Sequence, residues 1–165
     1  QKRGPPRETV VQEEKVNMSA DSPGMSVNQA ILLATKGHDG DRWGDYPYAT
    51  HLALVAQRVV DNGSGTDDAV AAAWLHDLYE DHPEYEDELR ARFPEIWNAL
   101  DLLAHDPAQG YMEYVQQVVD SGDEVALAVK YADLQTNLEN KPVQESTRDR
   151  YRAAIQLIES SGKLR

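Results

Sequence analysis

The chain has 165 residues, enough for one domain with a hydrophobic core of its own. Its 29 acidic residues against 16 basic ones give a net charge of −13, which argues against binding to DNA, RNA or an anionic membrane surface. It contains no cysteine, so disulfides and thiol catalysis are excluded.

Residues 1–25 are predicted to be a polar N-terminal tail or leader that lies outside the domain. This segment holds three of the eight prolines, shows no sustained apolar period and lacks the apolar stretch of a secretory signal. The longest apolar runs elsewhere, such as residues 69–75, are far below the ~20 residues that a membrane span needs. We therefore expect a cytoplasmic protein with one folded domain over residues 26–162.

The first half of the domain is predicted to form three helices. Residues 26–37 begin with a capping candidate and lead into a charged, glycine-rich loop. Residues 48–60 carry apolar side chains at helical spacing. Thr66 then caps a third helix, which is predicted to continue until Pro83 breaks it.

The second half is predicted to be helical as well. Two short helices follow, each with a proline in its first turn, and three longer ones cover residues 111–122, 123–140 and 147–162. No stretch alternates with the period of two that a strand requires. The predicted fold class is therefore all-α, a bundle of about seven or eight helices.

The dipeptide His-Asp occurs three times, and its surroundings differ. The pairs at residues 38–39 and 105–106 lie in or beside loops, and we expect them to be solvent-exposed turn residues. The pair at 76–77 instead follows an apolar helix face. At 100° per residue, Glu80 lies one turn beyond His76 and Asp81 one turn beyond Asp77. All four side chains then share one arc of a largely apolar helix.

Three carboxylates and an imidazole on such a face would cost several kcal/mol if they were buried without partners, and a divalent cation removes that conflict. Imidazole and carboxylate ligands suit Mn²⁺, Fe²⁺ or Zn²⁺. Two more ligand candidates interrupt apolar stretches. His51 directly precedes the apolar run LALVA (52–56), and Asp133 lies within VALAVKYADL (125–134). Taken singly, the first is more often a satisfied core histidine and the second a cap or a paired charge. Together with residues 76–81 they favour a metal site.

In this order, His51, His76-Asp77 and Asp133 match the H…HD…D pattern of HD-domain phosphohydrolases. More narrowly, the chain resembles the hydrolase domain of the RelA/SpoT family and the stand-alone small alarmone hydrolases. The resemblance covers about residues 27–160, and four stretches carry it: GHDGDRWGDYPYATH (37–51), AAAWLHDLYED (71–81), VKYADLQTN (129–137) and RYRAAIQLI (150–158).

The resemblance implies an HD-domain helical bundle with one divalent metal ion, typically Mn²⁺, with Fe²⁺ or Zn²⁺ as alternatives. It also implies removal of the 3′-pyrophosphate from guanosine 3′,5′-bis(diphosphate) and a small nucleotide as the partner. The metal ligands would be His51, His76, Asp77 and Asp133. The oligomeric state stays open.

Other roles are implied by the same resemblance. Glu80 and Asp81 would position and activate the attacking water. Arg42 would lie against the base, and Asn137 would touch the sugar or its phosphate. The remaining two candidates for substrate binding are Lys130 and Tyr151.

Departures from the family pattern leave two alternatives open. Leu52 stands where the family has proline, His82 where it has threonine, and Trp43 where it has a small or basic residue. The first alternative is an HD-domain nucleotidase, or a phosphohydrolase of another 3′-phosphorylated nucleotide, with a pocket that Trp43 and His82 would reshape. The second alternative is a non-catalytic module that only senses nucleotides, against which the intact Glu80-Asp81 pair argues.

Overall fold

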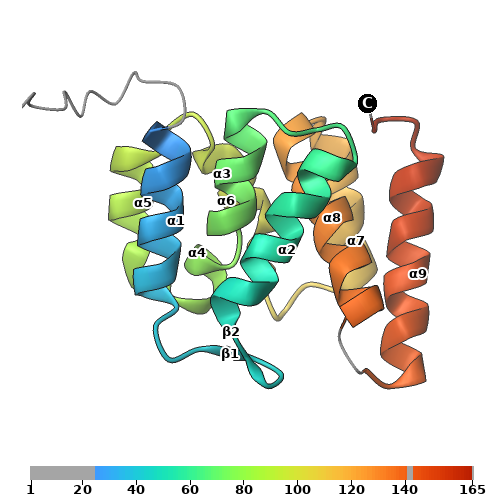
Figure 1. Cartoon of the computed structure of the whole chain (residues 1–165). Helices are drawn as coiled ribbons and strands as arrows, with labels where there is room; N and C mark the ends of the chain where they lie inside the picture. The colour runs from blue at the N-terminus through green and yellow to red at the C-terminus, as the bar shows by residue number, and fades with distance from the viewer. Residues whose placement is uncertain (1–24, 141–142, 165) are drawn as a thin grey trace, which may run out of the picture.

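The structure, a computed structural model, describes residues 25–140 and 143–164 (Figure 1). Apart from its last residue, the predicted tail lies outside the described residues. In chain order the elements are α1 (Met25–Gly37), β1 (Arg42–Trp43), β2 (Tyr46–Pro47), α2 (Tyr48–Asp61), α3 (Asp67–Leu75), α4 (Leu78–Asp81), the 3₁₀ turn η1 (Pro83–Tyr85), α5 (Glu86–Arg92), α6 (Trp97–Leu103), α7 (Tyr111–Ser121), α8 (Glu124–Asn140) and α9 (Glu145–Ser160). Apart from the single turn α4, these are eight α-helices, so the predicted all-α bundle is confirmed for the described residues.

The long helices run side by side, from α1 through α3 and α2 to α8 and α9 (Figure 1). Helix α3 lies among α1, α2 and α8 because its inward positions are small: four of its nine residues are buried alanines. Small side chains let neighbouring backbones approach closely. The predicted cap is present, since Thr66 Oγ1 accepts a hydrogen bond from the backbone N–H of Ala69 at 3.2 Å.

Helix α8 is buried over much of its surface because α2 and α3 pack against it, and so do α7 and α9. Most of its buried residues are apolar, but Lys130 and Asp133 are buried in the same helix. Buried ionic groups are rare unless they have partners. This central helix therefore carries charge into the interior, beside α2 and the end of α3. Within the described residues, no helix combines the length and hydrophobicity of a bilayer-spanning segment.

Two local features differ from the sequence-based expectation. The glycine-rich loop contains a short antiparallel hairpin, in which Arg42 pairs with Pro47 and Trp43 with Tyr46. Strands of two residues are too short to show an alternating pattern, and the turn depends on Gly44 at φ +59°. The predicted continuous third helix is interrupted at His76 and Asp77, between α3 and α4.

Candidate metal centre

Four side chains from three parts of the bundle converge at one buried place. His51 lies in the first turn of α2, His76 and Asp77 lie between α3 and α4, and Asp133 lies in the middle of α8. Nε2 of His51 is 3.0 Å from Oδ1 of Asp133, and Nε2 of His76 is 3.1 Å from Oδ2 of Asp77. Nε2 of His51 is also 3.6 Å from Oδ2 of Asp77, and Nε2 of His76 is 3.4 Å from Oδ1 of Asp133. The four predicted ligands are thus brought together, and they could hold a metal ion.

The hydrogen bonds of His76 suit a metal ligand. Its Nδ1 lies 2.6 Å from the carbonyl oxygen of Ala73, which requires a proton on Nδ1, so Nε2 is the nitrogen that would bind a metal. Nε2 is buried and forms no hydrogen bond with a described residue, although two carboxylates lie close to it. An orphaned nitrogen at the centre of the cluster is the geometry that a cation would satisfy.

The charges of the cluster also call for positive charge. Burial alone would lower the pKa of His51 and His76, but the carboxylates of Asp77 and Asp133 outweigh it and raise both pKa values. Burial would likewise raise the pKa of the two carboxyls, and cationic neighbours hold both well below their usual range. Either protons or a divalent cation can supply the charge that these carboxylates require.

Residues around the cluster hold the ligands in place. The Tyr48 hydroxyl donates to Oδ2 of Asp77 at 2.6 Å. Asp133 is held on both oxygens, because Asn137 Nδ2 donates to Oδ1 at 3.2 Å and Lys130 Nζ to Oδ2 at 3.2 Å. Such partners orient metal ligands in proteins. Asn137, predicted to touch the substrate's sugar, is thus engaged with a ligand.

One hollow beside the cluster, the cationic hollow, has a volume of about 160 Å³. Its lining comprises His76, Asp77, Glu80, Leu103, His105, Tyr111, Tyr114, Lys130, Asp133, Arg150 and Tyr151. Besides three of the predicted metal ligands, three other residues predicted from the sequence lie here: Glu80, Lys130 and Tyr151.

Two cations of the cationic hollow approach the same aromatic ring. Lys130 Nζ is 5.4 Å and the Arg150 guanidinium 4.7 Å from the centre of the Tyr111 ring. His105, expected to be a solvent-exposed turn residue, is half-buried, and its ring stacks on Tyr114 at 4.7 Å. Sequence reasoning did not single out Tyr111 and Tyr114 as site residues. Their apolar spacing in α7 gave no sign that they would also face a polar hollow.

A second hollow, the outer hollow, has a volume of about 270 Å³ and is more open. It is lined by Asp41, Arg42, Tyr48, Asp81 and His82. Arg42 is exposed, and its guanidinium donates to the backbone oxygen of Asp45 at 2.5 Å. The predicted base-binding arginine therefore lies in a different hollow from Lys130 and Tyr151.

The two acidic residues after the ligands lie in different hollows as well. Oε1 of Glu80 accepts a hydrogen bond from the backbone N–H of His105 at 2.7 Å. The Asp81 side chain forms no hydrogen bond or ion pair with the residues that the structure describes. Burial, Asp77 and Glu80 raise the pKa of Asp81 to about 6. The break at His76 and Asp77 is slight, because both residues keep right-handed helical backbone angles, and His76, Asp77 and Glu80 line the same hollow.

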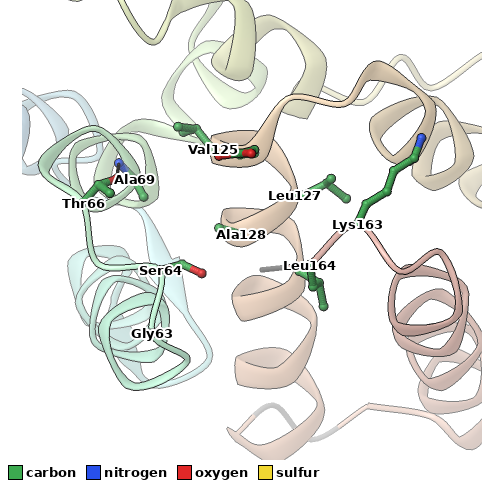
Figure 2. A pocket seen from close by; sticks show the side chains of 10 residues that line it. Gly63, Ser64, Thr66, Ala69, Val125, Leu127, Ala128, Lys163 and Leu164 are labelled. Atoms are coloured by element: carbon green, nitrogen blue, oxygen red, sulfur yellow. Dashed lines mark hydrogen bonds between the residues drawn. The ribbon is translucent and has the colours of Figure 1, made fainter.

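A further hollow, of about 250 Å³, lies away from this centre. Figure 2 shows side chains from the α2–α3 loop, the start of α3, the start of α8 and the C-terminal segment around it. One cationic group at its edge, Lys163 Nζ, donates to the backbone oxygen of Val119 at 2.9 Å. None of the predicted site residues lines this hollow.

Comparisons with known proteins add no assignment to this geometry. No family profile matches the chain. No curated protein matches it significantly.

Proposed function

We propose that the chain is a metal-dependent phosphohydrolase of phosphorylated nucleotides. The observation that carries this proposal is the buried cluster of His51, His76, Asp77 and Asp133 beside a hollow that contains Lys130 and Arg150. Cations in a hollow of this size suit a phosphate or a pyrophosphate group. This placement is notable because the chain as a whole carries a charge of −13.

The orphaned Nε2 of His76 and the excess of carboxylates fit a divalent metal ion in the cluster. We propose Mn²⁺, with Fe²⁺ and Zn²⁺ as alternatives of the same ligand preference. When bound, such an ion neutralises developing phosphoryl charge and lowers the pKa of a coordinated water.

The side chains of the hollows take the remaining roles. Lys130 and Arg150 bind the phosphoryl oxygens. Glu80 has one oxygen engaged with the loop at His105, so its other oxygen orients the attacking water. Asp81 lines the outer hollow but lies near enough to Asp77 and Glu80 for both to raise its pKa. Its carboxylate carries no competing hydrogen bond within the described part of the chain, and it takes the proton of that water.

The favoured substrate is guanosine 3′,5′-bis(diphosphate), as the family resemblance implies. Water attacks the 3′-linked phosphorus, a new P–O bond forms, and the bond from phosphorus to the ribose O3′ breaks. The water proton passes to Asp81, and O3′ takes a proton from solvent. The products are GDP and pyrophosphate. Arg42 in the outer hollow is the candidate for stacking on the base.

One observation favours a different nucleotide substrate. The outer hollow is lined by Asp41 and Asp81 beside Arg42, and Nε2 of His82 lies 2.5 Å from Oδ2 of Asp41. Two carboxylates at this position repel a second diphosphate. A phosphohydrolase of a less charged 3′-phosphorylated nucleotide, or a nucleotidase, is therefore the second candidate.

The test is a hydrolysis assay with Mn²⁺ on guanosine 3′,5′-bis(diphosphate), 3′-phosphorylated nucleotides and deoxynucleoside triphosphates. The variants are Asp81→Asn and, as a matched control, Asp87→Asn on the exposed side of α5. We expect pyrophosphate release by the wild type and Asp87→Asn, and at least a hundredfold slower release by Asp81→Asn with unchanged metal content. Turnover of another nucleotide alone would reject the alarmone as substrate. No turnover of any substrate by the metal-loaded protein would reject the enzyme and leave the sensing module.

A further inference from the structure

A second group of metal-ligating side chains lies outside the centre described above: His38, Asp41 and His82. Nδ1 of His38 is 2.9 Å and Nε2 of His82 is 2.5 Å from the same oxygen, Oδ2 of Asp41. The two imidazole rings are 5.3 Å apart between centroids and nearly perpendicular. Four of the five histidines of the chain thus belong to two clusters.

The fold places this second cluster through a close contact. His38 directly follows α1, and His82 directly follows α4. The end of α1 meets the start of α4 at Gly37, where a Cβ atom would lie only 2.4 Å from Cδ1 of Leu78. The absence of a side chain at Gly37 therefore lets the two histidines face each other. Asp41 is fixed between them, because its N–H donates to the His38 carbonyl at 2.9 Å.

The second cluster is buried on one side and open to solvent on the other. The expectation that His38 is a solvent-exposed turn residue is wrong, since its side chain is 1% exposed and its ring stacks on Tyr48 at 4.6 Å. The side chains of Asp41 and His82 are 33% and 26% exposed and line the outer hollow. Such a cluster has a rigid inner wall and open positions toward solvent, which a bound cation needs for water or a substrate oxygen.

The charges around the cluster favour a cation. Asp81 shares the hollow, and Glu84 lies 3.6 Å from Nδ1 of His82. Arg42 is the one permanently cationic residue among those that line this hollow. Two neutral imidazoles and a carboxylate, with more carboxylates beyond them, match the ligand set of zinc sites that retain an open position.

We propose that His38, Asp41 and His82 form a second divalent cation site that takes an ion of the Zn²⁺ type. This site is separate from the four-ligand cluster of His51, His76, Asp77 and Asp133. Its existence does not depend on the proposed hydrolase activity. Asp41 and His82 reach it from chain segments 41 residues apart. Tyr48 forms the wall between the sites, with its ring on His38 and its hydroxyl on Asp77.

Zinc stoichiometry tests the proposal without any substrate. Untagged, metal-stripped protein is equilibrated with zinc buffered by a competing chelator, and bound zinc is measured per chain by native mass spectrometry. The variants are His51→Ala for the first cluster and His82→Ala and Asp41→Asn for the second. His105→Ala is the matched control, because His105 is the one histidine outside both clusters.

We expect two zinc ions in the wild type and in His105→Ala, one in each of the other three variants, and none in the double variant His51→Ala/His82→Ala. X-ray absorption of zinc-loaded His51→Ala should show imidazole nitrogens at about 2.0–2.1 Å. Circular dichroism checks that each variant is folded. If His82→Ala does not fold, Asp41→Asn tests the second cluster in its place. Two ions retained in His82→Ala, or a single wild-type ion lost only in His51→Ala, would overturn the proposal.

Discussion

The hydroxyl of Tyr48 donates a hydrogen bond of 2.6 Å to Oδ2 of Asp77, a member of the four-ligand cluster. Burial of the phenol and the negative charge of Asp77 raise the pKa of Tyr48, so the phenol stays protonated and donates. The same oxygen lies 3.1 Å from Nε2 of His76 and 3.6 Å from Nε2 of His51, so the hydrogen bond from Tyr48 holds it beside the two histidines. Tyr48 thus orients a ligand from the first position of α2, three residues before His51.

Replacing Tyr48 with phenylalanine should weaken metal binding without unfolding the protein. The ring and its packing on His38 remain, but Asp77 loses the donor that orients it. Partners of this kind typically contribute roughly 10–100-fold to metal affinity. We expect at least a tenfold weaker Mn²⁺ affinity for Tyr48→Phe by calorimetric titration. Tyr46→Phe, at a 60% exposed tyrosine in β2, is the control and should bind like the wild type. Equal affinities in both variants would contradict the role of Tyr48.

Arg150 should contribute to substrate binding rather than to stability. It is an exposed residue of α9 whose guanidinium lies over Tyr111 at the cationic hollow. Loss of a charge-assisted hydrogen bond to phosphate should raise KM on the order of tenfold, with a melting temperature close to that of the wild type. The measurement is steady-state kinetics of Arg150→Gln on the substrate found active.

The control for Arg150→Gln lies two residues along the same helix. Arg152 is exposed and forms ion pairs with Glu145 at 3.0 Å and Asp149 at 3.2 Å, away from the hollow. Arg152→Gln removes the same charge from the molecule. If it raises KM as much as Arg150→Gln does, then general electrostatic attraction explains the effect, and the local role of Arg150 is refuted.

Sequence reasoning found the four-ligand cluster because each ligand interrupts an apolar helical pattern. A buried polar residue without a local partner is a strong signal, and His51 and Asp133 lie in stretches that the pattern places in the core. The all-α class followed from the same periodicity. Both inferences depend on local sequence, which is where single-sequence analysis is informative.

The second cluster could not be found in this way. His38 lies in a glycine-rich loop, and such loops are usually exposed. Its burial depends on the contact of Gly37 with Leu78 and on Asp41, which meets His82 from 41 residues away. Long-range contacts of this kind leave no periodic trace in the sequence. The cationic hollow escaped notice for a related reason, since Tyr111 and Tyr114 have the spacing of ordinary core residues.

Gly37→Ala should destabilise the protein and disturb the site. The new methyl group would overlap Leu78, which is fully buried and cannot move without displacing its neighbours. Overpacking of this kind costs about 1–3 kcal/mol. Because Leu78 opens α4, which carries Glu80 and Asp81, activity should fall as well. Chemical denaturation and the hydrolysis assay measure the two effects.

Gly110→Ala is the matched control for Gly37→Ala. Gly110 precedes α7 at φ −59°, and the nearest atoms to an added Cβ are 3.9 Å away. Glycine is preferred over alanine at this N-cap position, so the substitution costs roughly 0.5–1 kcal/mol, less than the overpacking expected at Gly37. Equal destabilisation by the two substitutions would show that the contact between α1 and α4 is not as close as the structure has it.

The ion pair of His82 with Asp41 should make stability depend on pH. The hydrogen bond to Asp41 raises the pKa of His82 above its usual 6.5, and Glu84 and Asp81 act in the same direction while burial opposes it. The hydrogen bonds from His82 and His38 lower the pKa of Asp41 below its usual 3.8. The contribution of His82 is therefore fully present below pH 6.5 and is lost as pH rises through its folded pKa. That of Asp41 is present above pH 3.8 and is lost as pH falls through its folded pKa.

The wild type should accordingly exceed His82→Gln in stability most clearly between about pH 4 and 6.5. Glutamine keeps a hydrogen-bond donor but does not titrate, so the difference isolates the charge of the imidazolium. For a partly exposed pair we expect roughly 0.5 kcal/mol, and the difference should fade toward pH 9. Denaturant titrations at pH 5.5 and 9, with a chelator to keep metal from the cluster, measure it. A difference that is constant or grows with pH would mean that His82 is neutral in the folded protein and that its contact with Asp41 is not an ion pair.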